Sequence, residues 1–113
     1  MKKIEAIIQP GKFDEVSAAL GEAGYPGITI SEVKGHGKQK GITHNWLGKK
    51  FKTELIEKIR LEIVVVDSEA EKIIQAILAA AKTGKTGDGK IFVHRIDQAY
   101  KISSGEEGDG VVS

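Results

Sequence analysis

The chain has 113 residues, which is enough for a buried core, and we expect a single domain over residues 1–113. It contains no cysteine, and this excludes disulfides and cysteine-based metal or redox chemistry. No stretch resembles a signal peptide or approaches the ~20 apolar residues that span a bilayer, so we expect a soluble, cytoplasmic protein without direct membrane insertion.

The positive charge is concentrated in one segment. Residues 34–60 contain eight lysines and arginines against two glutamates, a local charge of +6, so the rest of the chain carries −5 of the net +1. A basic segment on an acidic body indicates an anionic ligand or an anionic partner surface. A solvated lysine-rich loop would have the same composition, and that alternative stays open.

In chain order, the apolar run at 3–10 predicts a first strand, and apolar residues at helical spacing over 13–23 predict a helix that ends at Gly24. Alternation over 28–35 predicts a second strand. Residues 36–55 show no period, which predicts a long loop.

The second half begins with the strongest predicted strand, residues 58–67. A capping box formed by Ser68 and Glu71 predicts the start of a second helix, whose apolar stripe covers 70–81. A glycine-rich turn and a fourth strand at 91–97 follow. The acidic, glycine-rich tail, about 104–113, is expected to be mobile.

A shift of 57 residues aligns the apolar positions of the two halves of the chain. The aligned pairs are Ile4 with Leu61, Ile8 with Val65, Val16 with Ile73, and Leu20 with Ile77. Two copies of one βαβ unit favour an α+β, ferredoxin-like βαββαβ plait, with two helices on one face of an antiparallel sheet and the long loop between strands 2 and 3.

Strand 58–67 carries apolar side chains on both faces. One face has Ile59, Leu61, Ile63 and Val65, and the other has Val64 and Val66 beside Arg60 and Glu62. Because the helices of a plait cover only one face of the sheet, the second apolar face predicts that the sheet packs against other copies of the chain.

Two glycine-rich segments have the composition of anion sites. In KGHGKQKG (34–41) and TGKTGDGK (83–90), glycines let backbone N–H groups approach an anion closely and lysines add charge. Neither is a Walker motif or a dinucleotide fingerprint. A ligand-free loop remains possible for the first segment, and a helix cap followed by a turn remains possible for the second.

The sequence offers these anion sites without a catalytic nucleophile. The three histidines lack metal-ligand spacing, and no serine or cysteine stands in a nucleophilic arrangement. This indicates binding rather than catalysis.

Four segments now resemble the PII nitrogen-regulatory signal-transduction family, over nearly the whole chain. They are MKKIEAIIQPGKFDEV at the start, EVKGHGKQKG (32–41), KIRLEIVVVD (58–67) and above all AKTGKTGDGKIFV (81–93). The resemblance implies a homotrimer with nucleotide sites in the clefts between subunits. It implies a non-enzymatic sensor of ATP and ADP that also takes 2-oxoglutarate when Mg-ATP is bound. Its effector loop, about 37–55, would dock onto a target transporter or enzyme, with no nucleic acid as partner.

Matched position by position, the resemblance assigns Thr29 and Val64 to the adenine and ribose pocket, with Glu62 nearby. The residues implied to approach the phosphates are Gly35, Gly37 and Lys38 on one side and Gly87, Asp88, Gly89 and Lys90, in the phosphate loop 82–90, from the neighbouring chain. The resemblance also implies that Gln39 binds Mg²⁺ and that Lys58 holds the distal carboxylate of 2-oxoglutarate, with backbone groups of Gln39, Lys40 and Gly41 around that ligand.

Three departures from the family pattern change the expected function. Phe51 replaces a tyrosine that many members modify, so modification at this position is chemically impossible. Leu47 replaces the arginine that commonly plugs an ammonium channel, which leaves that transporter uncertain as a target. Lys101 and Ser103 replace two phosphate-binding arginines, and this predicts weaker nucleotide binding or an altered ATP/ADP preference.

The remaining expectations concern the aromatic residues of the effector loop and three alternative functions. Trp46, Leu47 and Phe51 are expected to anchor a partner, although the two aromatics could instead fold back onto the trimer. An adenylate-only sensor that has lost 2-oxoglutarate and regulates a target outside nitrogen metabolism is the alternative function. An enzyme that uses His36 or His94, or a nucleic-acid-binding plait, is disfavoured, the latter because strands one and three lack stacking aromatics on the open face.

Overall fold

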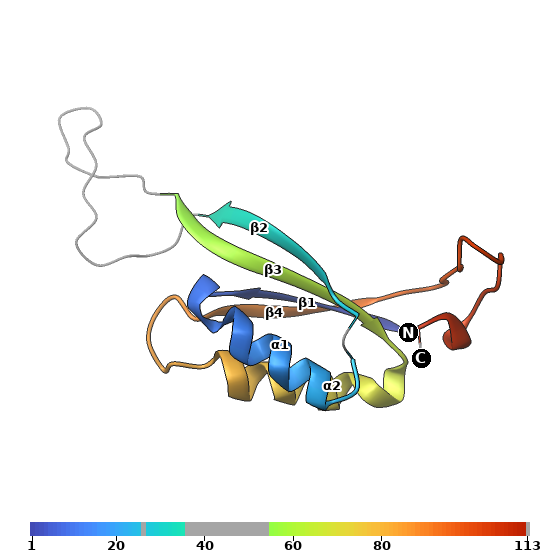
Figure 1. The fold of residues 1–113 in the computed structure, drawn as a ribbon, viewed down its shortest axis with the longest axis horizontal. Coiled ribbons are helices and arrows are strands. Elements are labelled where there is room, and N and C mark those ends of the chain that lie inside the picture. Colours follow the sequence, from blue (N-terminus) through green and yellow to red (C-terminus); the bar gives the residue numbers. More distant parts are fainter. Residues whose placement is uncertain (26, 36–54, 113) are drawn as a thin grey trace.

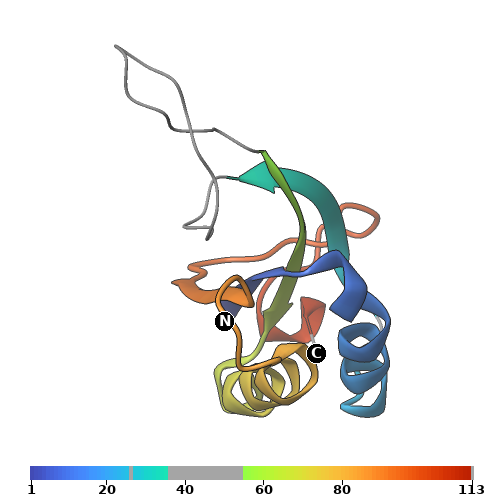
Figure 2. The ribbon, with the colours of Figure 1, turned by 90° about the vertical axis from the view of Figure 1, so that its left-hand side faces the viewer.

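The computed structural model describes residues 1–25, 27–35 and 55–112. Its elements are β1 (Lys2–Ile8), η1 (Pro10–Lys12), α1 (Phe13–Glu22), β2 (Thr29–Gly35), β3 (Ile56–Val65), α2 (Asp67–Ala81), β4 (Gly89–Arg95) and η2 (Asp109–Val111). The strands form one sheet in the order β2-β3-β1-β4, with every neighbouring pair antiparallel. Both helices cover the same face of this sheet (Figures 1 and 2). The predicted ferredoxin-like plait is therefore confirmed.

The core lies between the helices and the sheet, and it matches the internal repeat. The eight largest side chains that are fully buried are Ile4, Ile8, Val16, Leu20, Leu61, Val65, Ile73 and Ile77. These are the eight residues that the 57-residue shift pairs. Each half therefore contributes one strand and one helix through equivalent positions, and hydrophobic burial at those positions holds the two units together.

Helix α1 ends where the sequence predicts, and helix α2 begins differently. Gly24 has a φ of +91°, the left-handed conformation that glycine adopts readily after a helix. Helix α2 begins at Asp67 with Val66 as its N-cap and no side-chain cap hydrogen bond, so the predicted capping box of Ser68 is wrong. The reason is that Asp67 already occupies the first turn, where its carboxylate lies 3.0 Å from the amino group of Met1.

The sheet face opposite the helices mixes apolar and charged side chains. Leu61, Ile63 and Val65 of β3 are buried on the helix side, as predicted. On the open face, the Glu62 carboxylate lies 3.2 Å from Lys3 Nζ and 3.3 Å from Arg60 Nε. Packing of this open face against other copies stays a prediction.

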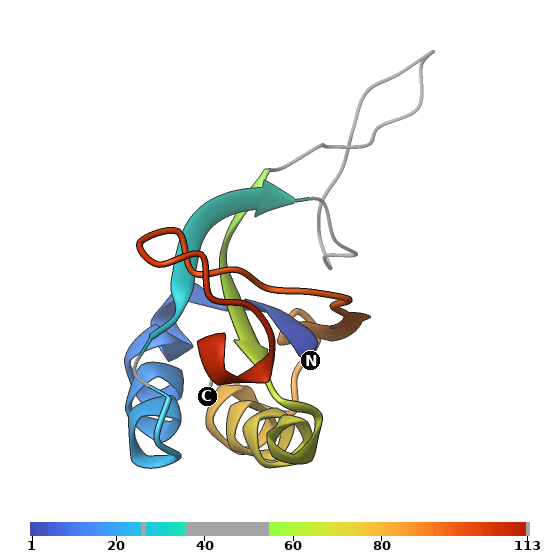
Figure 3. The same cartoon turned by 90° about the vertical axis from the view of Figure 1, so that its right-hand side faces the viewer.

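The C-terminal tail folds into a turn at the end of the sheet that also holds the N-terminus (Figures 1 and 3). The N–H of Lys101 donates to the Glu106 carbonyl (2.8 Å) and the N–H of Gly108 donates to the Ala99 carbonyl (3.1 Å). The tail thus has defined hydrogen bonds where the sequence predicts mobility. Its mobility in solution stays a prediction.

Within the part of the chain that the structure describes, no helix has the length and apolar character needed to cross a membrane.

Candidate anion site at one end of the sheet

The glycine-rich segment between α2 and β4 is closed by the carboxylate of Asp88. Asp88 Oδ2 accepts hydrogen bonds from the backbone N–H groups of Thr83 (2.8 Å) and Gly84 (2.9 Å), and Oδ1 accepts one from the Thr83 hydroxyl. These bonds favour the ionised carboxylate, and the Thr83 hydroxyl is the main cause of a pKa for Asp88 below its ordinary value. The carboxylate therefore shapes the loop, and only the backbone of Asp88 is free to face a ligand.

Two side chains hold the carbonyl of Gly87, one from β3 and one from the residue that follows β1. Lys58 Nζ donates to this oxygen at 2.5 Å, and Gln9 Nε2 donates to it at 3.2 Å. Gln9 Nε2 also lies 3.3 Å from Asp88 Oδ1. Gln9 is not among the site residues predicted from the sequence. No pattern in the sequence points to Gln9, because it reaches the glycine loop only through strand pairing: the preceding residue, Ile8, pairs with both Ile59 and Gly89.

Glycine is required at position 89 because the chain passes very close to β1 there. A Cβ atom at this position would lie 1.7 Å from the carbonyl oxygen of Ile7, and the φ of +103° is rarely adopted by other residues. Gly87 also has a positive φ, of +98°. The glycine-rich sequence is thus explained in part by the entry into β4, as the cap-and-turn alternative proposed.

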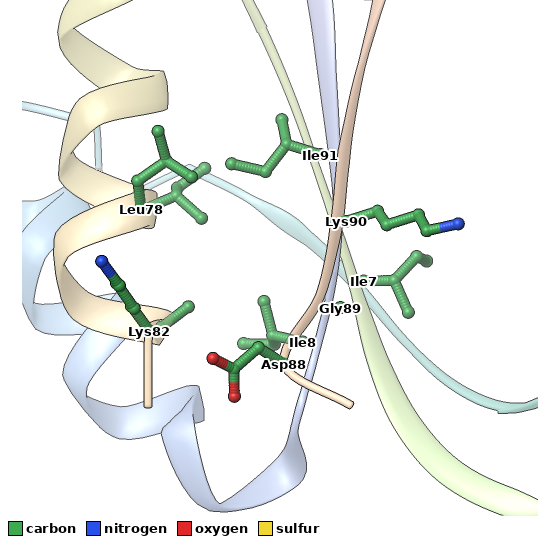
Figure 4. A pocket seen from close by; sticks show the side chains of 10 residues that line it. Ile7, Ile8, Leu78, Lys82, Asp88, Gly89, Lys90 and Ile91 are labelled. Carbon is green, nitrogen blue, oxygen red and sulfur yellow. The ribbon is translucent and has the colours of Figure 1, made fainter. Parts of the chain in front are cut away.

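A pocket of about 150 Å³ beside the loop is mostly aliphatic. Its lining consists of Ile7, Ile8, Ile77, Leu78, Ala81, Lys82, Asp88, Gly89, Lys90 and Ile91. Figure 4 shows the Asp88 carboxylate directed toward the Lys82 end of α2, while the Lys90 side chain extends away from α2 on the other side of β4. The pocket interior therefore offers an anion little beyond apolar surface.

The cations collect instead on the open face of the sheet, next to the loop. Lys90 pairs with Ile7, which pairs with Arg60, so these three share the open face. Lys58 shares that face two residues before Arg60, and its ammonium already reaches the loop at Gly87. An anion placed here would meet two lysines and the backbone of residues 87–90.

The residues that the resemblance assigns to nucleotide binding fall into two groups at opposite ends of the sheet. Gly35 pairs with Ile56 at the loop end, whereas Thr29 pairs with Glu62 six residues further along β2, about 20 Å away at strand spacing. Val64 also lies beyond Glu62, and the tail with Lys101 and Ser103 lies at the end of the sheet far from the loop (Figure 1).

The glycine loop lies next to Lys58 of its own chain. Lys58 and Gly87 of the same chain are hydrogen-bonded, and Gly35 pairs with Ile56, two residues before Lys58. The approach of a neighbouring chain's glycine loop to Gly35 stays a prediction.

Several predicted site residues lie outside the described residues. They are Gly37, Lys38, Gln39, Lys40, Gly41, Trp46, Leu47 and Phe51, together with His36. Of the predicted effector loop, 37–55, the structure describes Leu55 alone, whose side chain is exposed.

Three observations bear on metal binding and catalysis. Among residues 1–25, 27–35 and 55–112, no three histidines or carboxylates gather as a metal site. His94 lies in β4 opposite Lys3, at an exposed position. The Asp88 carboxylate accepts four donors, which leaves it poorly suited to a metal ion.

The structure thus defines a ferredoxin-like plait with a lysine-flanked glycine loop at one end of its sheet. Comparison with known families matches residues 1–106 to the model described as "Nitrogen regulatory protein P-II". The chain belongs to this family of nitrogen-regulatory signal-transduction proteins.

Curated relatives agree along their whole length. Proteins named "Nitrogen regulatory protein P-II" are 46% identical in Microchaete diplosiphon and 48% identical in Rhodospirillum rubrum, each over 112 residues that cover 99% of this chain and 100% of the relative. The protein of the same name from Rhizobium meliloti is 49% identical over 108 residues, 96% of each chain.

Proposed function

We propose that this protein is a non-enzymatic, cytoplasmic sensor that works as a homotrimer and binds ATP or ADP between its subunits. With Mg-ATP bound it takes 2-oxoglutarate, and it controls a target transporter or metabolic enzyme through its effector loop. The observation that carries the proposal is that the residues assigned to nucleotide binding by the family resemblance are divided between two ends of one sheet. A nucleotide that contacts both groups must lie between two copies of the chain.

The loop end suits the phosphates of a nucleotide. Lys58 and Lys90 supply positive charge on the open face, and the backbone of Gly87 and Gly89 has no side chain to keep an oxyanion away. The opposite end, with Thr29 and Glu62 of a neighbouring copy, would take the adenine and ribose. Lys101 and Ser103 of that copy would reach the phosphates with less planar, bidentate contact than arginine gives, so we expect modest affinity.

Lys58 suits the distal carboxylate of 2-oxoglutarate. In the structure its ammonium donates to a neutral carbonyl, and a carboxylate is the stronger acceptor for a cation. Mg²⁺, when bound with ATP, would supply charge neutralisation between the phosphates and the 2-oxoglutarate oxygens. The described residues offer it no carboxylate cluster, so we assign its protein contact to Gln39.

The position of the site explains how a ligand could change the effector loop. The loop leaves the sheet after Gly35 and re-enters it at Ile56, two residues before Lys58. Ligands that contact these strand ends differently would favour different loop conformations. Trp46, Leu47 and Phe51 would then present or withdraw apolar anchors for the target.

Calorimetric titration of 2-oxoglutarate tests the proposal. We expect binding with Mg-ATP and none with Mg-ADP or without nucleotide. Lys58→Ala should abolish 2-oxoglutarate binding. The control is Lys72→Ala, which should leave binding unchanged, because Lys72 is an exposed residue of α2 that pairs loosely with Glu69 (3.9 Å). Failure of ATP and ADP to bind at all would refute the proposed sensor.

An adenylate-only sensor is the second candidate. It is favoured by the Lys58–Gly87 hydrogen bond, because a lysine already bonded within its own chain is less available to a dicarboxylate. Binding of ATP and ADP without 2-oxoglutarate binding under any condition would select this candidate and place the target outside nitrogen metabolism.

A further inference from the structure

The Gln9 side chain makes two contacts with the glycine loop. Its side-chain nitrogen lies within hydrogen-bonding distance of the Gly87 carbonyl and of the Asp88 carboxylate, 78 and 79 residues away in the sequence. Both partners accept hydrogen bonds and cannot donate them, so only the amide NH₂ group can face them. The orientation of the Gln9 amide is therefore determined by its partners.

The backbone of Gln9 is also fixed. Ile8, directly before it, is buried and pairs with both β3 and β4. The carbonyl of Gln9 accepts the N–H of Lys12 at 2.9 Å, in the turn that begins η1. The side chain therefore extends from an ordered base, and it can hold the loop without first becoming ordered itself.

Gln9 and Lys58 share one acceptor, and only Lys58 has a charge to attract a ligand. If an anion takes Lys58 away from Gly87, the carbonyl of Gly87 keeps one donor among the residues that the structure describes, the amide of Gln9. Without that donor, the loop would lose both contacts from β1 and β3 at the moment when its backbone must contact the ligand.

We propose that Gln9 is a positioning residue of the anion site, which holds the glycine loop at Gly87 and Asp88 when Lys58 leaves Gly87 to bind an anion. This inference rests on the proposed function for the identity of the anion, a nucleotide phosphate or a dicarboxylate. The holding contact itself exists without ligand and can be tested without it.

The test measures hydrogen exchange of the loop amides in the full chain. The Lys58→Ala variant imitates departure of the lysine, and Gln9→Glu in that background exchanges the donor for an acceptor of the same shape. The amides to follow are those of Thr83 and Gly84, which donate to Asp88, and of Lys85, which donates to the Thr83 hydroxyl oxygen. Gln75→Glu is the matched control, because Gln75 is an exposed residue of α2 whose amide donates to Glu71 (2.9 Å), away from the glycine loop.

At pH 7.5 we expect these amides to exchange about tenfold faster in Lys58→Ala/Gln9→Glu than in Lys58→Ala. The Asp88 carboxylate and the Gly87 carbonyl lose the Gln9 donor, and Asp88 then faces a second negative charge. The ratio of the two exchange rates should fall toward one as the pH is lowered to about 4, where a glutamate carboxyl group takes up a proton and can donate to Asp88. If Gln9→Glu merely damaged the packing of the loop, the exchange-rate ratio would not change with protonation of the introduced carboxyl group. Equal exchange in the two variants, or the same acceleration from Gln75→Glu, would overturn the role of Gln9.

Calorimetry with Mg-ATP then separates the two proposals. We expect Gln9→Glu, with Lys58 intact, to weaken Mg-ATP binding several-fold at pH 7.5 and Gln75→Glu to leave it unchanged. Faster exchange without any loss of affinity would overturn the assignment of Gln9 to the site. If the unmodified protein fails to bind Mg-ATP, the proposed function falls, while the exchange ratio still decides whether Gln9 holds the loop.

Discussion

The entry into β4 leaves no space for a side chain at Gly89. In Gly89→Ala, the new methyl group would lie 1.7 Å from the Ile7 carbonyl oxygen, so the β1–β4 pairing that begins there must shift. We expect the free energy of unfolding to fall by about 3 kcal/mol or more, since steric displacement adds to the ~1–2 kcal/mol cost of a positive φ. Urea unfolding at a fixed protein concentration measures this loss.

Gly84 provides the matched control for that prediction. Its φ is +85°, and nothing lies within 4 Å of a Cβ atom built there. Gly84→Ala should therefore cost only the ~1–2 kcal/mol of the backbone conformation. Equal losses from the two substitutions would show that the close approach of Gly89 to Ile7 does not determine the choice of glycine.

The pH dependence of stability follows from Asp88. Because hydrogen bonds from Thr83 and Gly84 lower the pKa of Asp88 in the folded protein, its ionised form stabilises the fold above the ordinary carboxyl pKa of 3.8. That contribution is lost as the pH falls through the lowered pKa. We expect the stability difference between the unmodified protein and Asp88→Asn to be constant from pH 7 to 5 and to shrink below pH 4.

Urea unfolding of both proteins at a series of pH values measures this difference, and the subtraction removes most contributions of other carboxylates. A difference that stays constant down to pH 3 would mean that the Asp88 carboxylate is not specifically hydrogen-bonded in solution.

At the scale of elements, the sequence predicts the plait because the two halves repeat one pattern of burial. Val16 and Ile73 of the helices, and Ile4 and Leu61 of the strands, occupy equivalent buried positions, so apolar spacing alone identifies four of the six main elements. Boundaries are less predictable. Strand β4 begins at Gly89, two residues before its apolar run, because glycine permits the close pairing with β1.

The candidate site was only partly predictable for a related reason. Lys58 and residues 87–90 are recognisable from composition and from the family motif. The bond from Gln9 to Gly87 is not, because it joins positions 78 residues apart that meet only when β1 and β4 pair. The sequence also does not show that the Asp88 carboxylate accepts hydrogen bonds from the N–H groups of Thr83 and Gly84, so its part in shaping the loop was not predictable. The approach of Asp88 to a nucleotide phosphate stays a prediction.

At the scale of the whole molecule, the division of the site between two ends of the sheet predicts complementation between defective subunits. Lys90→Glu damages the loop end, and Lys101→Glu damages the tail at the opposite end (Figure 1). In the proposed homotrimer, either variant alone should bind ATP poorly at every site. In a mixed trimer, one cleft combines the intact loop end of one subunit with the intact tail of its neighbour.

Unfolding and refolding the two variants together in equal amounts should therefore restore binding at about a quarter of all sites, since three-quarters of random trimers are mixed and each contains one intact cleft. Calorimetry with ATP gives this fraction as the stoichiometry. Mixing without refolding, which leaves the original trimers intact, is the control. Absence of restored sites after refolding would mean that each chain binds the nucleotide by itself, and the composite site would have to be abandoned.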